Sequence, residues 1–217
     1  MTDVSTPGAP VTFPSDDLTL EGLFHRPQAT PYPAAVICHP HPLFGGDMHN
    51  SVVAAVCQAL VEADIAALRF NFRGVGRSLG RFGDGVGERA DAIAALAHLR
   101  QIEGVDPAKV SIVGYSFGAA VALVAADEQM AAVVAISTPT FGRGIPELSI
   151  RCPTLLVSGD RDDVAPPGQL TALAEMIGPQ CQVALVRDAD HFWWGHEEKV
   201  AQAVALFFHD CLRTPGQ

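Results

Sequence analysis

The feature that most constrains the fold is an alternation of short apolar runs with longer helix-like segments, which begins at residue 32. The apolar runs are hydrophobic on both faces, which is typical of parallel strands covered by helices on two sides. Their alternation with helical segments predicts an α/β domain with a mostly parallel central sheet and helices on both faces. The predicted strands are 34–40, 65–72, 109–114, 131–137, 153–159 and 181–186, and the predicted helices are 50–63, 88–102, 117–127, 168–177 and 197–211.

The start of the chain follows a different pattern. The stretch "VTFPSDDLTLEGLFHRP" alternates around Leu18, Leu20 and Phe24, with a turn at 15–17, and this predicts an antiparallel N-terminal part of the sheet. A length of 217 residues suits one domain, and we find no internal repeat or linker. We therefore expect a single domain over residues 1–217, with flexible ends at 1–9 and 213–217.

The composition excludes several classes of protein. The net charge of −10 would repel phosphate backbones, so we expect no nucleic-acid partner. No run approaches the roughly 18 apolar residues of a membrane span, and the first residues lack the features of a signal peptide. The five cysteines are odd in number and widely spaced, which predicts free thiols in a cytoplasmic protein. Cys38 and Cys57 lie in apolar runs and are expected in the core.

The segment "GYSFG", residues 114–118, lies where an apolar strand is followed directly by an alanine-rich helix. It matches the G-x-S-x-G turn, which projects a nucleophilic serine at the end of a strand. Such a turn holds the serine in a strained backbone conformation, and side chains two residues to either side would collide with the strand or the helix. Gly114 and Gly118 avoid this collision, so Ser116 is the predicted nucleophile.

A nucleophilic serine needs a histidine base. In proteins with this turn, the acid and then the histidine follow the serine along the chain. His191, in "RDADHFWWG" directly after the last predicted strand, is the predicted base. His196 begins the final predicted helix and is the alternative, whereas His209 lies inside that helix and is interpreted as structural.

The predicted acid lies in "GDRDDVAPP", after the strand that ends at residue 159. Three carboxylates compete there, those of Asp160, Asp162 and Asp163. The spacing G-x-x-D, with a proline four residues later, favours Asp162 and leaves the other two as turn and cap residues.

With these motifs the chain resembles the α/β-hydrolases, specifically a small bacterial lidless group with an "HPHPLFGG" loop and an "FNFRGVGRS" segment. The resemblance covers residues 11–211. It implies a Ser116–His191–Asp162 triad and esterase-type activity. The connection "TPTFGRGIPELSIRC" is too short for a helical cap domain, so we expect an open, shallow cleft.

Acyl transfer also needs N–H donors for the oxyanion of the tetrahedral intermediate. The first expected donor is the backbone N–H of Phe117. The second should come from the loop 39–46, in which Pro40 and Pro42 have no N–H to offer. Many relatives in the superfamily use the residue after a His-Gly pair, which corresponds here to His41, and Leu43 is the alternative.

Two loop patterns suggest other chemistry but lack its remaining requirements. His39 and His41 alternate as a metal pair would, yet no third ligand with metal spacing accompanies them. The glycines of "RGVGRSLG" do not fit G-x-G-x-x-G, so a dinucleotide site is not expected and this stretch is interpreted as a flexible loop at the rim. We therefore expect no metal and no cofactor.

The predicted function is that of a serine carboxylesterase for short-chain esters, because an open cleft has little apolar wall to bury a long chain. A monomer or a homodimer is expected, with a small-molecule ester as substrate. The alternatives are a thioesterase or amide hydrolase with the same triad, and a non-catalytic binding module on a hydrolase scaffold. Expected substrate-binding residues are Phe44, Tyr115, Phe141, Phe192 and Trp193, with Trp194 in the core.

Overall fold

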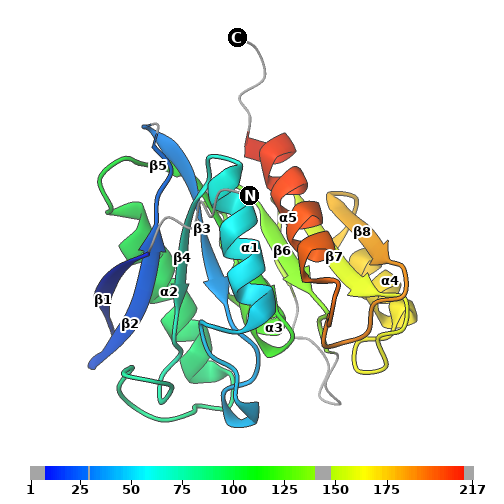
Figure 1. Ribbon diagram of the computed structural model, residues 1–217, viewed down its shortest axis with the longest axis horizontal. Coiled ribbons are helices and arrows are strands. Elements are labelled where there is room, and N and C mark those ends of the chain that lie inside the picture. The colour runs from blue at the N-terminus through cyan, green and yellow to red at the C-terminus, as the bar shows by residue number, and fades with distance from the viewer. Residues whose placement is uncertain (1–7, 29, 140–147, 213–217) are drawn as a thin grey trace.

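A computed structural model describes residues 8–28, 30–139 and 148–212 of the chain. Its centre is an eight-stranded sheet with the strand order β1-β2-β4-β3-β5-β6-β7-β8 (Figure 1). β2 runs antiparallel to both of its neighbours, whereas the strands from β4 through β3 to β8 are parallel. The strands are β1 (Ala9–Ser15), β2 (Leu18–His25), β3 (Tyr32–Cys38), β4 (Ala66–Phe70), β5 (Val105–Tyr115), β6 (Val133–Ile136), β7 (Thr154–Gly159) and β8 (Cys181–Val186).

Helices cover both faces of this sheet. The helices are α1 (Ser51–Glu62), α2 (Val86–Arg100), α3 (Phe117–Ala125), α4 (Pro167–Ile177) and α5 (Glu197–Leu212), with a short 3-10 helix η1 (Pro42–Phe44). α1 and α5 lie side by side in front of the sheet in Figure 1, and α2 and α3 lie behind it. Within the described residues, no helix is both long and apolar enough to span a membrane.

The predicted fold class is confirmed, with its antiparallel start and its parallel series of strands. The connection from Ile136 to Thr154 is short, as a fold without a helical cap requires. Ala9, expected in a flexible end, pairs with Phe24. The expectation that every later strand is covered on both faces is wrong for β8, because β8 is an edge strand with a half-exposed Leu185.

The core has two layers, one on each face of the sheet, because successive residues of a strand point to opposite sides. Ala34, Val36 and Cys38 of β3 pack in the layer formed with α2, α3 and α4. Ile37 of the same strand packs in the layer formed with α1 and α5, which also contains Cys57. The prediction that Cys38 and Cys57 are buried is confirmed.

The loops that follow the parallel strands meet at one edge of the sheet, where ligands of open α/β sheets bind. These loops come together at the lower edge of the molecule in Figure 1. They include the segments after β3, β5, β7 and β8, in which the sequence places its candidate functional residues.

Candidate active site

Ser116 lies at the turn between β5 and α3 in a strained backbone conformation, with φ 54° and ψ −119°. A side chain at Gly114 would place its Cβ 2.0 Å from the carbonyl oxygen of Gly118. A side chain at Gly118 would come within 2.4 Å of the Cys38 carbonyl oxygen. Both glycines are therefore required by the close packing of the turn against α3 and β3, as the sequence predicts.

Three side chains from separate loops converge beside this turn. Ser116 Oγ lies 3.0 Å from Nε2 of His191, which follows β8. Nδ1 of the same ring lies 3.0 Å from each carboxylate oxygen of Asp162, which follows β7. A carboxylate beside Nδ1 keeps the proton on that nitrogen and leaves Nε2 free to accept the serine proton.

Asp162 is buried and accepts hydrogen bonds from several directions. Its Oδ1 accepts from the N–H groups of Val164 and Ala165 at 3.0 and 2.7 Å. Its Oδ2 accepts from the Ser158 hydroxyl at 3.2 Å. Burial acts to raise the pKa of Asp162, but hydrogen bonds from His191, the Ala165 N–H and the Ser137 hydroxyl hold that pKa below its ordinary value. The carboxylate is therefore kept ionised and fixed in orientation.

The other carboxylates and histidines considered above lie elsewhere. Asp160 is exposed, and it accepts a hydrogen bond from the Asp188 N–H at 2.7 Å. Asp163 is also exposed. His196 packs at the start of α5, where its N–H bonds to the Trp193 carbonyl, and His209 lies within α5. The hydrogen bonds to His191 thus involve Asp162 alone among the three competing acids.

The loop that carries His191 is held in place by hydrogen bonds on both sides. Asp190 Oδ1 accepts from the N–H groups of Phe192 and Trp193 at 2.9 and 3.0 Å. The Tyr115 hydroxyl donates to the carbonyl oxygen of His191 at 2.7 Å. Tyr115 is buried, and this burial raises the pKa of its hydroxyl. Tyr115 therefore supports the loop that carries His191, and its contact with substrate stays a prediction.

The two tryptophans of this loop have the reverse of their expected positions. Trp193 is 0% exposed and packs between α5 and the sheet, where its indole Nε1–H donates to Ser137 Oγ at 3.0 Å. Trp194 is 76% exposed and stacks on Phe192. The left-handed backbone of Trp193, with φ 63°, turns the chain at this point. Trp194, instead of Trp193, therefore lies beside Phe192 at the surface.

The predicted oxyanion donors differ in whether their N–H groups already bind an acceptor. Phe117 is the first residue of α3, so its N–H has no acceptor within the helix. The Leu43 N–H is already donated to Nδ1 of His41 at 3.2 Å. Among the described residues no acceptor is found for the N–H of His41 or of Phe117. Of the two predicted second donors, Leu43 thus has an acceptor for its N–H and His41 has none among the described residues.

His39 has a structural position at the end of β3. Its Nδ1 lies 2.6 Å from the Pro40 carbonyl oxygen, and its Nε2 accepts the Phe72 N–H at 3.1 Å. Burial lowers its pKa to about 4. Because both ring nitrogens bind backbone groups, His39 ties the loop after β3 to the end of β4. No cluster of potential metal ligands occurs in the described part of the chain.

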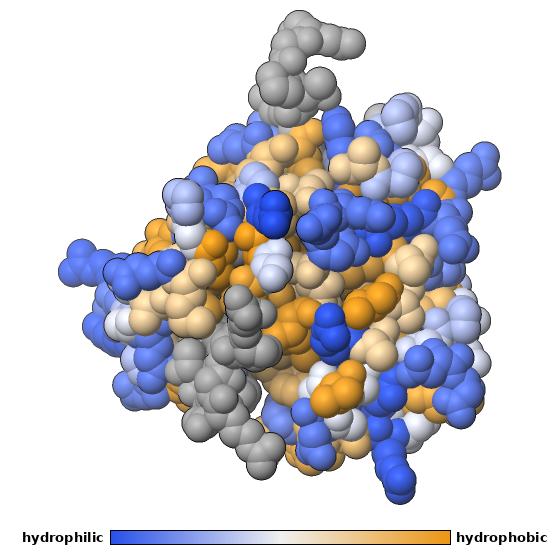
Figure 2. All heavy atoms as spheres, turned by 180° about the vertical axis from the view of Figure 1, so that it is seen from behind, coloured by the Kyte–Doolittle hydropathy of each residue, from blue (hydrophilic) through white to orange (hydrophobic). Residues whose placement is uncertain are grey.

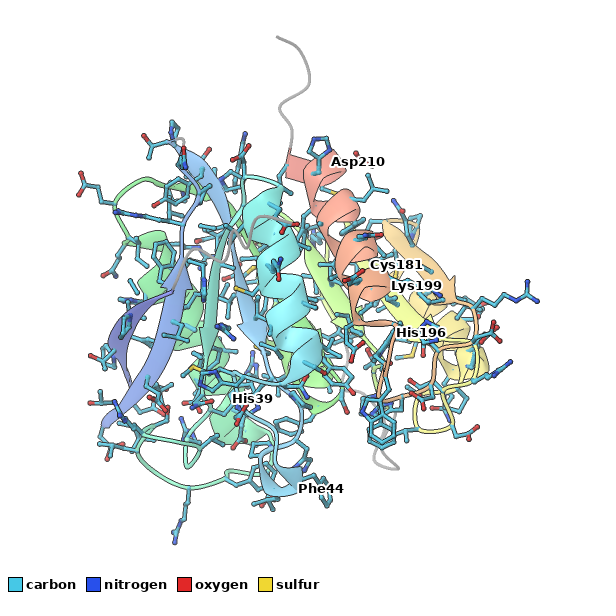
Figure 3. The ribbon with its side chains drawn as sticks, viewed as in Figure 1. His39, Phe44, Cys181, His196, Lys199 and Asp210 are labelled. Carbon is cyan, nitrogen blue, oxygen red and sulfur yellow. The ribbon has the colours of Figure 1, made fainter. Side chains whose placement is uncertain are left out.

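Exposed hydrophobic residues form a rim on two of the loops that carry the site. Phe44 is 87% exposed and lies at the lower edge of the molecule, with His39 closer to the sheet (Figure 3). Phe82, which the sequence did not single out, packs against the rings of His41 and Phe117. Phe141, expected to bind substrate, lies outside the described residues. The exposed rim residues of the loops after β3 and β8 are Leu43, Phe44, Phe192 and Trp194.

A shallow groove runs beside this site. It has a volume of about 630 Å³ and lies between the start of α2 and α3, with Phe117, Ala120 and Val124 in its wall. Figure 2 shows this side of the molecule, on which hydrophobic residues reach the surface. The nucleophile turn is therefore adjacent to an open apolar surface.

The loop after β4 is fixed by a buried ion pair. Arg73 Nη2 lies 2.7 Å from Oδ1 of Asp91, whose side chain is fully buried. The Ser15 hydroxyl donates to the same oxygen at 2.7 Å. The Arg73 N–H donates to Oδ2 at 2.9 Å. These bonds join the "RGVGRSLG" stretch to α2 and β1, so it is better described as an anchored loop than as a flexible one.

The fold and this arrangement are those of a hydrolase class built on a serine at a strand-to-helix turn. A family model described as an alpha/beta hydrolase domain matches residues 35–203, and the chain belongs to this α/β-hydrolase family. It is 33% identical to the uncharacterised protein RP471 of Rickettsia prowazekii, over 85% of this chain and 82% of that protein.

Solved structures show the same likeness. A serine hydrolase homologue from Coxiella burnetii is 33% identical, with a TM-score of 0.82 over 95% of this chain and 97% of its own. XC6422 from Xanthomonas campestris, described as a serine hydrolase without a lid, is 28% identical, with a TM-score of 0.87 over 99% of this chain and 100% of its own. These two neighbours, described as a serine hydrolase or its homologue, are of nearly the same length as this chain.

Proposed function

We propose that the protein is a serine carboxylesterase that cleaves short-chain acyl esters through an acyl-enzyme on Ser116. His191 Nε2 takes the hydroxyl proton as Ser116 Oγ attacks the ester carbonyl. Asp162 holds the imidazole in the required tautomer and stabilises the imidazolium that forms. His191 then gives the proton to the leaving alkoxide, and the alcohol departs. Water, activated by the same histidine, hydrolyses the acyl-enzyme and restores Ser116.

The observation that carries this proposal is the pair of 3.0 Å contacts that join Ser116 to His191 and His191 to Asp162. A polar turn with a merely structural role needs neither a strained serine nor a buried acid behind the histidine. The N–H groups of Phe117 and His41 are the proposed oxyanion donors, and each is worth roughly 3 kcal/mol in transition-state stabilisation.

The open site supports a preference for small acyl groups. Phe44, Phe192 and Trp194 lie on the loops that carry His41 and His191, and their side chains are largely exposed to solvent. Such a surface buries few methylenes of a long chain, each of which contributes about 0.8 kcal/mol when buried. Short esters therefore lose little binding free energy at this open site, and long acyl chains gain little.

A fluorophosphonate probe tests the catalytic proposal. The native protein should form a stable adduct on Ser116, and Ser116→Ala should form none. Asp163→Asn serves as a control, because its exposed carboxylate takes no part in the proposed triad. The proposal fails if the native protein is not labelled, or if Ser116→Ala is labelled to the same extent.

A further inference from the structure

Two buried polar side chains behind the proposed triad are joined by a hydrogen bond. The indole Nε1–H of Trp193 donates to Ser137 Oγ at 3.0 Å, and both side chains are fully buried. Ser137 directly follows β6 and has a left-handed backbone, with φ 50°. Its N–H donates to the Val157 carbonyl oxygen of β7 at 2.7 Å, which fixes its position beside the strand that leads to the acid.

The proton of the Ser137 hydroxyl has a defined direction. An indole N–H can only donate, so Ser137 Oγ is the acceptor in its bond with Trp193. A serine hydroxyl has a single proton, which is then free to be donated elsewhere. The Ser137 N–H holds this residue against β7, the strand that leads to Asp162, and a hydrogen bond from the Ser137 side chain is one of the causes that lower the pKa of that carboxylate. The bond from Trp193 therefore leaves the Ser137 proton free for the acid.

The second hydroxyl beside the acid is bound differently. Ser158 Oγ lies 3.2 Å from Asp162 Oδ2 and 3.1 Å from the Ala165 carbonyl oxygen. Its one proton is shared between two acceptors, so its hydrogen bond to the carboxylate is weaker. Ser137 Oγ instead accepts a hydrogen bond from Trp193, so its own proton can be donated to the carboxylate of Asp162.

Trp193 also belongs to the loop that carries the base. It is two residues from His191, and its ring belongs to the core layer that also contains Val200 and Val204 of α5. One side chain thus anchors the histidine loop in the core and reaches, through Ser137, the acid that must meet that histidine. The acid and the base come from different loops, and this contact sets their relative positions.

We propose that Ser137 and Trp193 are positioning residues, which act as a pair to hold Asp162 in register with His191. The inference rests on the proposed function, because it assigns the two residues a role in that same triad. It assigns them no contact with substrate. Their loss should lower the rate of acylation and leave substrate binding unchanged.

Four proteins test the pair: the native chain, Ser137→Ala, Trp193→Phe and the double variant. Trp193→Phe keeps an aromatic ring and removes the N–H. With p-nitrophenyl acetate, each single variant should lose about tenfold in kcat, as expected for a hydrogen bond to a charged group. KM should stay within about twofold, and the double variant should lose no more than Ser137→Ala. The rate constant for fluorophosphonate labelling should decrease by the same factor as kcat in each variant.

Matched controls exist for both substitutions. Ser111 is a buried serine of β5 whose Oγ has no partner among the described residues, and Tyr32 is a buried aromatic residue whose hydroxyl donates to the Glu103 carbonyl oxygen, away from the site. Ser111→Ala and Tyr32→Phe should keep kcat within about twofold of the native value. Urea unfolding of every variant separates lost positioning from lost structure. If Trp193→Phe does not fold, the comparison of Ser137→Ala with Ser111→Ala decides.

Three results would overturn the inference. The first is native kcat in Ser137→Ala, and the second is a double variant whose loss is the product of the two single losses. The third is an equal loss of kcat in Ser111→Ala. A native protein that neither turns over esters nor reacts with the probe would refute the proposed function itself, which is a distinct outcome.

Discussion

The hydroxyl of Tyr115 donates a hydrogen bond of 2.7 Å to the carbonyl oxygen of His191. Tyr115 directly precedes Ser116, so the residue beside the proposed nucleophile also supports the loop of the proposed base. The rings of Tyr115 and His191 are tilted relative to each other, with 5.9 Å between their centroids. The distance between Ser116 and His191 therefore depends on a contact that involves neither reacting atom.

Tyr115→Phe should lower kcat/KM about fivefold, because it removes one hydrogen bond to a buried carbonyl, worth about 1 kcal/mol. Tyr32→Phe is the matched control, since its hydroxyl donates to the Glu103 carbonyl oxygen at 3.1 Å, away from the site. Steady-state ester hydrolysis by the two variants provides the measurement. An equal loss of activity in Tyr32→Phe would contradict the account.

Gly118→Ala should destabilise the fold by roughly 1–3 kcal/mol, as expected for overpacking, and abolish labelling of Ser116. Its Cβ would lie 2.4 Å from the carbonyl oxygen of Cys38, and backbone atoms there have little room to move. Gly168 in α4 has no atom within 4 Å of such a Cβ. Gly168→Ala should therefore keep full activity, and thermal unfolding should show it to be as stable as the native chain or slightly more stable.

Asp91→Asn should destabilise the protein by about 3 kcal/mol, because it removes the fully buried charged partner of Arg73 and leaves Arg73 paired with the exposed Asp16. Asp127 forms a more exposed pair with Arg100 at 3.4 Å. Asp127→Asn should change stability by less than about 1 kcal/mol. Urea unfolding curves of both variants test this difference. Equal losses in the free energy of unfolding would show that the buried pair contributes no more to stability than the exposed one.

Much of this architecture could be predicted from the sequence, because the signals are local. The apolar runs define the parallel strands, and the glycines of the turn follow from steric crowding that the structure shows at Gly114 and Gly118. The spacing after β7 singled out Asp162 among three neighbouring carboxylates, and that residue meets His191 in the structure.

The remaining features depend on contacts between distant segments. Nothing local distinguishes Trp193 from Trp194, and a single left-handed residue decides which of them enters the core. The contact of Ser137 with Trp193 joins residues 56 positions apart, so no local sequence motif predicts it. β8 has the composition of a covered strand, and only its place at the end of the sheet leaves Leu185 half exposed.

Stability should fall as the pH decreases from about 6.5 to about 4, because of His39. Burial lowers its pKa from 6.5 to about 4 in the folded protein, so over this range the unfolded chain binds a proton that the folded protein does not. The stabilisation is complete above pH 6.5 and decreases by roughly 3 kcal/mol on the way to pH 4. Urea unfolding at several pH values measures this slope. His39→Asn should flatten it, and an unchanged slope in that variant would assign the effect to other groups.

The most direct test of the central claim is to capture the acyl-enzyme. The protein is mixed with excess p-nitrophenyl butyrate and quenched in acid within the first turnovers, and its peptides are mapped by mass spectrometry. The account predicts a butyryl group on Ser116, with no such adduct and no turnover in Ser116→Ala. Ester hydrolysis that persists in Ser116→Ala, or a butyryl group found only on another residue, would contradict it.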